Sequence, residues 1–128
     1  MILGTGIDLM DPARMERAAE KSEGRILDRL FTMGEQAYCK RRRDQWLSFA
    51  ARFAAKEAFV KALGLGIRQG LAWNEIEVVN NEWGRPDLVL KGKAAEIVDE
   101  RGINSIHLSL SHQKGMAIAS VILEGESP

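Results

Sequence analysis

The stretch WLSFAARFAAKEAFVKALG, residues 46–64, decides the fold of this 128-residue chain. It is rich in Ala, Leu, Lys and Glu and has neither Pro nor Gly before Gly64, so it predicts a helix of several turns that ends at that glycine. At about 100° per residue, one face of this helix carries an apolar stripe, which consists of Trp46, Phe49, Ala50, Phe53 and Val60. The other elements are expected to pack around this helix.

A carboxylate interrupts the apolar stripe, because Glu57 lies about 20° from Trp46 on the helical projection. A carboxylate on the core side of a helix is costly unless a charge or a metal ion compensates it. One interpretation is a structural ion pair with Lys61, one helical turn further along. The other interpretation is a catalytic or metal-binding carboxylate, and the helix alone does not choose between the two.

The composition is that of a soluble globular protein, and the length predicts a single domain over residues 1–128. Lys plus Arg and Asp plus Glu number 18 each, so the overall charge favours no polyanionic partner such as nucleic acid. The basic run 40–43 lacks the interleaved aromatic residues typical of nucleic-acid binding. The single Cys39 is typical of a reducing compartment, and no apolar run approaches the roughly 18 residues of a membrane span. We therefore expect a cytoplasmic protein without a membrane segment.

The remaining segments predict an α+β fold, with a small antiparallel sheet and shorter helices around the central helix. The expected elements are strands at residues 1–10, 75–79, 87–90, 103–112 and 116–123, and shorter helices from Pro12, within 25–43 and within 92–102. In the strand 103–112 the alternation sends His107 and Ser109 to one face and the leucines to the other. His107 and His112 differ in parity, so they do not form a metal site together.

Two carboxylates stand in otherwise apolar elements: Asp8 late in the first strand, and Glu57 in the central helix. Oxygen ligands in small number suit Mg²⁺, which completes its shell with waters and substrate phosphates. Lys56 and Lys61, on either side of Glu57, are expected to neutralise such phosphates. The residues alone therefore favour Mg²⁺-dependent phosphate chemistry.

Three blocks resemble the signature blocks of the 4′-phosphopantetheinyl transferases, namely GTGIDLMDPAR at 4–14, RFAAKEAFVKALG at 52–64 and HLSLSH at 107–112. The length and block spacing resemble the short bacterial type. The resemblance implies transfer of the 4′-phosphopantetheine arm of coenzyme A to a serine of apo acyl carrier protein in fatty acid biosynthesis, with release of adenosine 3′,5′-bisphosphate. It also implies the family's fold.

The resemblance carries the family's site residues onto matching positions of this sequence. Asp8 and Glu57 match its metal-binding carboxylates and Lys61 matches a lysine that contacts the phosphates, so these three are the expected catalytic residues. The coenzyme A contacts are expected at Arg52, Lys56, Lys61, Gly64, Gly66, His107 and Ser109. The general base stays open between Glu57, a metal-bound water and His107.

Three basic side chains share one side of the helix that follows Pro12, at spacings of three and four residues: Arg14, Arg17 and Lys21. Arg25 would extend that side if Gly24 does not end the helix. Such stripes are mostly solvated surface. In the family, however, this helix docks against an acidic helix of the carrier protein, so these four residues are the expected carrier-binding residues.

Two further expectations concern assembly and the competing function. The short members of the family are usually trimers with active sites between subunits, so the resemblance implies a homotrimer. The alternative is a non-catalytic basic module that docks acidic helices or RNA. Such a module has no need for carboxylates in apolar elements, whereas the transferase does.

Overall fold

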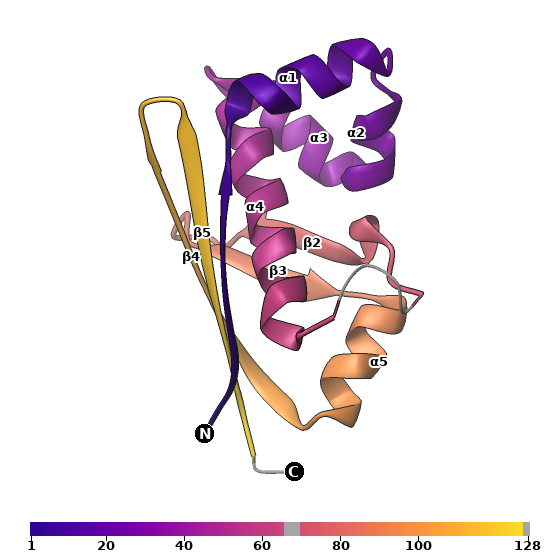
Figure 1. Cartoon of the computed structure of the whole chain (residues 1–128), viewed down its shortest axis with the longest axis vertical. Helices are drawn as coiled ribbons and strands as arrows, with labels where there is room; N and C mark the ends of the chain where they lie inside the picture. Colours follow the sequence, from indigo (N-terminus) through magenta and orange to yellow (C-terminus); the bar gives the residue numbers. More distant parts are fainter. Residues whose placement is uncertain (66–69, 127–128) are drawn as a thin grey trace.

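The computed structural model of the chain describes residues 1–65 and 70–126. Helix α4 (Gln45–Leu63) passes through the middle of the molecule, between a sheet on one side and shorter helices on the other (Figure 1). Its N-cap is Asp44, whose carboxylate accepts a hydrogen bond from the Leu47 amide at 3.2 Å. Gly64 ends the helix in the left-handed conformation, with φ of 74°. The predicted central helix is therefore confirmed to within one residue at each end.

Helix α4 is buried around most of its circumference rather than along a single stripe. Its small side chains let neighbouring elements approach from several sides, and Ala54, Ala55 and Ala58 are completely buried. Two members of the predicted stripe, Trp46 and Phe53, are only partly buried. No helix in the described part of the chain is both long enough and apolar enough to cross a membrane.

The strands form two antiparallel sheets. The first is three-stranded and has the order β1 (Ile2–Met10), β5 (Met116–Gly125), β4 (Ile103–Gln113). The second is a separate hairpin of β2 (Ile76–Asn80) and β3 (Pro86–Leu90). The predicted α+β fold, a small antiparallel sheet on a long helix, is confirmed. The strands predicted at 75–79 and 87–90 pair with each other and form a sheet of their own.

The short helices lie mainly around the N-terminal half of α4, as Figure 1 shows. They are α1 (Pro12–Lys21), α2 (Arg25–Leu30), α3 (Met33–Lys40), the 3₁₀ turn η1 (Trp73–Glu75) and α5 (Gly92–Glu100), which lies at the other end. Gly24 separates α1 from α2, because it adopts a left-handed φ of 85°. Arg25 therefore starts a new helix. The α1 face was expected to extend to Arg25 only if Gly24 did not end the helix, and that condition is not met.

Strand β1 lies directly against α4 because two of its residues that face the helix are glycines. A Cβ atom at Gly6 would overlap the carbonyl oxygen of Ala58, and one at Gly4 would overlap that of Ala62. Only glycine permits such an approach of strand and helix backbones. The next residue of β1 with the same orientation is Asp8, whose carboxylate is thereby brought to α4.

Candidate functional site

Asp8 and Glu57 lie in one cavity of about 340 Å³ between β1, α1, α2 and α4. Arg14 of α1 lines the same cavity. The other walls are largely apolar and include Met10, Met15, Ala18, Ile26, Leu30 and Phe53. The structure thus brings together the two carboxylates that stood out in the sequence, and it adds an arginine from the first basic helix.

Lys61 forms its ion pair with Asp8. Its Nζ donates to Asp8 Oδ1 at 2.8 Å and to the carbonyl oxygen of Ile7 at 3.2 Å. Within the described ranges 1–65 and 70–126, Glu57 takes part in no ion pair. The Glu57–Lys61 pair considered from helical spacing is therefore wrong, because the close approach of β1 gives Lys61 a nearer carboxylate.

Burial raises the pKa of the Glu57 carboxyl above its ordinary value, and the neighbouring Asp8 carboxylate raises it further. Lys61 and Arg14 lower the pKa of the same group, but with smaller effect. A carboxylate with a raised pKa is a stronger base, and its negative charge is incompletely balanced by its surroundings. Glu57 is therefore suited to accept a proton or to bind a cation.

The donor set of this cavity fits a hard divalent cation. Two carboxylates lie near one another, and Mg²⁺ characteristically uses one or two carboxylates and fills its other positions with waters and substrate phosphates. Among the described residues, no group of three or more His, Cys, Asp or Glu side chains is placed to hold a metal. Asp8 and Glu57 could therefore hold such an ion only together with ligands from water or substrate.

Lys56 points to another side of α4 and is wholly buried. Its Nζ donates to Glu35 Oε1 at 2.7 Å, to the Leu30 carbonyl at 2.7 Å and to the Trp73 carbonyl at 3.1 Å. All three ammonium protons are thus used inside the fold. The expected contact between Lys56 and coenzyme A phosphates is therefore wrong, because this side chain has neither exposure nor a free donor.

Arg52 lines a second groove, of about 430 Å³, between α3, α4, the turn after β2 and the end of β4. It is only 5% exposed; its Nη2 donates to Asn80 Oδ1 at 2.8 Å and its guanidinium carbon lies 4.0 Å from the centre of the Tyr38 ring. Its Nε is buried and has no hydrogen-bond partner among residues 1–65 and 70–126. This arginine groove also contains Arg42, Arg43, Ser48, Ser111 and His112. Several guanidinium groups around one groove suit a phosphate-bearing ligand.

His107 and Ser109 are exposed on the face of the sheet that points away from α4. His107 Nε2 lies 2.9 Å from Glu124 Oε1, and the intervening Leu108 is buried on the inner face. The predicted alternation is confirmed. Asp8 faces α4, however, so the sheet separates these two residues from the carboxylates within one chain.

Of the two glycines expected to approach the cofactor, Gly64 is described and lines neither cavity. Gly64 caps α4, and a Cβ atom placed there would meet no atom within 4 Å. Gly66 lies outside the described residues. The cofactor role of both glycines stays a prediction.

The sequence model of the 4′-phosphopantetheinyl transferase superfamily matches residues 4–119. The chain belongs to this superfamily. It is 51% identical to the holo-[acyl-carrier-protein] synthase of Trichlorobacter lovleyi over 124 residues, which are 97% of this chain and 98% of that protein. The corresponding protein of Geobacter metallireducens is 48% identical over the same shares of the two chains.

Solved structures of the superfamily share the fold. The holo-[acyl-carrier-protein] synthase of Neisseria meningitidis is 31% identical, has a TM-score of 0.90, and aligns over 97% of this chain and 99% of its own. The structure of the Helicobacter pylori enzyme in complex with coenzyme A is 32% identical, with a TM-score of 0.82, and covers 94% of this chain and 99% of that one.

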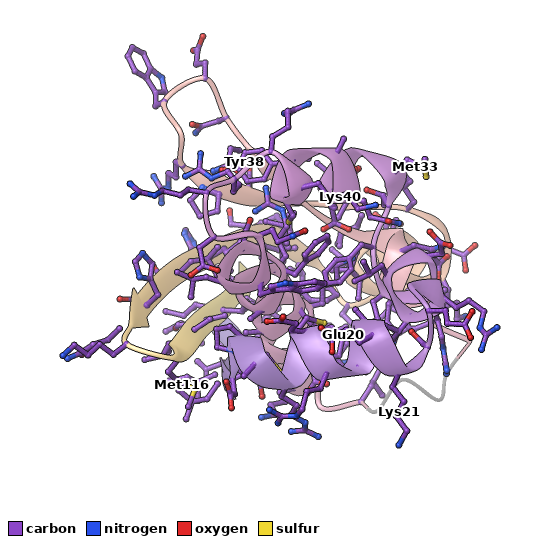
Figure 2. All side chains as sticks on the ribbon, turned by 90° about the horizontal axis from the view of Figure 1, so that it is seen from above. Glu20, Lys21, Met33, Tyr38, Lys40 and Met116 are labelled. Atoms are coloured by element: carbon purple, nitrogen blue, oxygen red, sulfur yellow. The ribbon has the colours of Figure 1, made fainter. Side chains whose placement is uncertain are left out.

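The transferase's expected carrier-binding residues are exposed, but they do not form one surface with equal access to the cavity. Arg14 alone among them lines it. Figure 2 shows Lys21 at the end of α1, where its side chain extends away from the fold. Arg17 is exposed between them on α1. Of the four expected carrier-binding residues, the structure therefore connects only Arg14 directly with the carboxylate cavity.

Sequence reasoning missed three basic members of the arginine groove: Arg42, Arg43 and His112. The available signals were the basic run 40–43 and the last residue of the block 107–112. The run was interpreted only as a site for nucleic acid or an acidic helix, and His112 belonged to the signature block 107–112 but received no role of its own. Nothing in the sequence shows that a strand end and a loop before α4 meet at Arg52.

Proposed function

We propose that this chain has the activity of the holo-[acyl-carrier-protein] synthases to which it is similar. It transfers the 4′-phosphopantetheine arm of coenzyme A to a serine of apo acyl carrier protein and releases adenosine 3′,5′-bisphosphate, as a step of fatty acid biosynthesis. The observation that carries the proposal is the cavity that contains Asp8 and Glu57, with Lys61 paired to Asp8, within the range that matches the superfamily model. The enzyme is placed in the cytoplasm, which suits the free, buried thiol of Cys39.

Mg²⁺ is the proposed metal cofactor, and Asp8 and Glu57 are the residues proposed to hold it. When bound, the ion neutralises negative charge that develops on the pyrophosphate during transfer. The fit rests on the two neighbouring carboxylates, one of which has an incompletely balanced charge. Lys61 Nζ donates to two oxygens of β1, the Ile7 carbonyl at 3.2 Å and Asp8 Oδ1 at 2.8 Å. Its side chain is about half exposed, so the ammonium can also donate to a phosphate oxygen.

The transfer forms a bond between the serine oxygen and the β-phosphorus of coenzyme A and breaks the bond from that phosphorus to the bridging oxygen. The proton of the serine hydroxyl needs an acceptor, and the leaving bisphosphate takes the bond's electron pair. Glu57 is the proposed acceptor, since burial and the neighbouring Asp8 carboxylate raise the pKa of its carboxyl group. His107 is a poor alternative within one chain, because it lies on the opposite face of the sheet.

The nucleotide end of coenzyme A is assigned to the arginine groove, where Arg52 supplies a buried guanidinium. Arg52 and Glu57 are five residues apart on α4, which places them about 140° apart around the helix axis. The groove and the carboxylate cavity therefore open on different sides of α4. One coenzyme A molecule can use both kinds of site more easily if they come from neighbouring copies.

A homotrimer with active sites between subunits is therefore part of the proposal. Its support is the outer face of the sheet, where apolar side chains are exposed around His107 and Ser109. Ile7 is 63% exposed and Leu9 is 58% exposed, and such a patch is typical of an interface. A neighbouring copy seated on this face would also bring the outer histidine and serine within reach of another chain's ligand.

Incubation of the protein with apo acyl carrier protein, coenzyme A and Mg²⁺ should add the mass of one phosphopantetheine to the carrier. EDTA should abolish the gain, and a native mass spectrum of the same preparation should show three copies of the 14.2 kDa chain. No gain with several carrier proteins, from a folded preparation, would contradict the transferase. A gain that survives EDTA would contradict only the metal requirement, and a monomer that is fully active would contradict only the shared site.

Arg14→Glu should raise the KM for the carrier protein by about tenfold or more, because a positive charge that meets an acidic helix is reversed. The KM for coenzyme A should change much less. Steady-state kinetics with each substrate varied in turn separates the two constants. Arg25→Glu is the matched control at a basic position on α2, with a smaller expected effect because it does not line the cavity. Equal losses for both substrates would contradict the docking role of Arg14.

A further inference from the structure

The ammonium group of Lys61 contacts Asp8, which is one of the two carboxylates proposed to bind the metal ion. Lys61 Nζ is 2.8 Å from Asp8 Oδ1, an ion-pair distance. A divalent ion bound to Asp8 would meet this ammonium as a like charge at close range. The positive group already present must therefore move, or the metal binds against its repulsion.

The formal charges around the cavity sum to zero before any ligand enters, although burial and the Asp8 carboxylate leave Glu57 only partly compensated. Asp8 and Glu57 carry two negative charges, and Lys61 and Arg14 carry two positive ones within electrostatic range of Glu57. A divalent cation alone would leave two excess positive charges in a partly desolvated site. The pyrophosphate of coenzyme A would supply compensating negative charge, together with oxygens that an ammonium group can bind.

The two partners of this ion pair differ in their freedom to move. The side chain of Asp8 is 12% exposed and that of Lys61 is 54% exposed. A lysine has a long flexible stem, so its ammonium can change partner without repacking of α4 or β1. Asp8 is held on a strand that lies directly against the helix. The mobile half of the pair is therefore the lysine.

We propose that Lys61 is a displaceable counter-ion of Asp8, so that a divalent cation binds weakly until the phosphates of coenzyme A draw the ammonium away. Lys61 thus has two successive partners, a carboxylate in the free enzyme and a phosphate in the loaded one. Metal and coenzyme A then strengthen each other's binding by the same factor, as linkage requires. This inference rests on the proposed function for the identity of the phosphate ligand only.

Binding of Mn²⁺, measured by electron paramagnetic resonance with and without coenzyme A, tests the inference without any turnover. Lys61→Gln removes the competing charge, so it should bind Mn²⁺ on the order of fivefold more tightly than the wild type in the absence of coenzyme A. Coenzyme A should tighten Mn²⁺ binding by the wild type and do so much less for Lys61→Gln. Lys93→Gln is the matched control, because it removes one exposed lysine on α5, 3.8 Å from Glu96, and it should match the wild type throughout.

Lys61→Arg provides a second variant, because it keeps the positive charge beside Asp8. It should bind Mn²⁺ no more tightly than the wild type. Equal or weaker Mn²⁺ binding by Lys61→Gln without coenzyme A, or no binding at all, would overturn the counter-ion role. The measurement without coenzyme A uses only groups of this chain, so its result stands even if carrier modification is never observed.

Discussion

Glu57→Gln is expected to lower the rate of phosphopantetheine transfer by about 10³-fold or more, since both proton transfer and metal binding depend on this carboxylate. Glutamine has nearly the same size but is neither a base nor a strong ligand for a hard cation. The fold should be unaffected, because Glu57 makes no ion pair that the substitution would break, within the ranges that the structure describes. Single-turnover transfer, followed by mass spectrometry of the carrier, gives the rate.

Glu100→Gln is the matched control for this substitution. Glu100 is exposed at the end of α5 and lines neither the carboxylate cavity nor the groove at Arg52, so the same loss of charge there should leave transfer unchanged. Thermal unfolding of both variants checks that the fold persists. A folded Glu57→Gln protein with more than about a tenth of the normal rate would exclude Glu57 as an essential group. A non-catalytic basic module would be indifferent to this change, so the same variant separates the two function classes.

Lys56→Met should lower the free energy of unfolding by about 3–5 kcal/mol, because it leaves the Glu35 carboxylate buried without its counter-ion. Both side chains of this pair have no solvent exposure. The substitution also removes the donor to the carbonyl groups of Leu30 and Trp73. Urea unfolding, followed by circular dichroism, measures the loss.

Lys56→Met combined with Glu35→Gln tests whether the uncompensated charge is the cause. Glutamine keeps an oxygen that can accept from the Val78 amide, which Glu35 Oε2 now does at 2.8 Å. The double variant should therefore be more stable than Lys56→Met alone, because no unpaired carboxylate is left in the core. It should still be less stable than the wild type, because the hydrogen bonds of Lys56 are lost. If Lys56→Met alone costs less than about 1 kcal/mol, the buried pair does not hold these elements together.

The central helix and the strands could be predicted because their signals are local. Helix-forming residues from Trp46 onward, with Gly64 at the end, specify α4 without reference to other segments. The alternation in β4 likewise separates His107 from Leu108. The degree of burial of α4 was not predictable in the same way, since it depends on how many elements pack around its alanines.

Partners in the site depend on tertiary contacts, and here the sequence predictions failed for both lysines. Helical spacing suggested an ion pair between Glu57 and Lys61, but β1 places Asp8 nearer to the Lys61 ammonium. For Lys56, the partner Glu35 lies on a different helix, and its sequence context T-x-x-E indicates a capping box, which it also forms with Thr32. The meeting of Asp8 and Glu57 in one cavity agrees with the expectation from two carboxylates in apolar elements, while their catalytic roles stay predictions.

The contact of Gly4 and Gly6 with α4 also has an evolutionary consequence. The gap between the Asp8 and Glu57 carboxylates is set by how closely two backbones approach, and this approach depends on positions that carry no side chain. A single added methyl group on β1 would force the strand away from α4 and shift Asp8 relative to Glu57, although neither carboxylate had changed. Substitution at either glycine would therefore alter the geometry of the proposed metal site without changing either proposed ligand, so selection on that site also acts on these two positions.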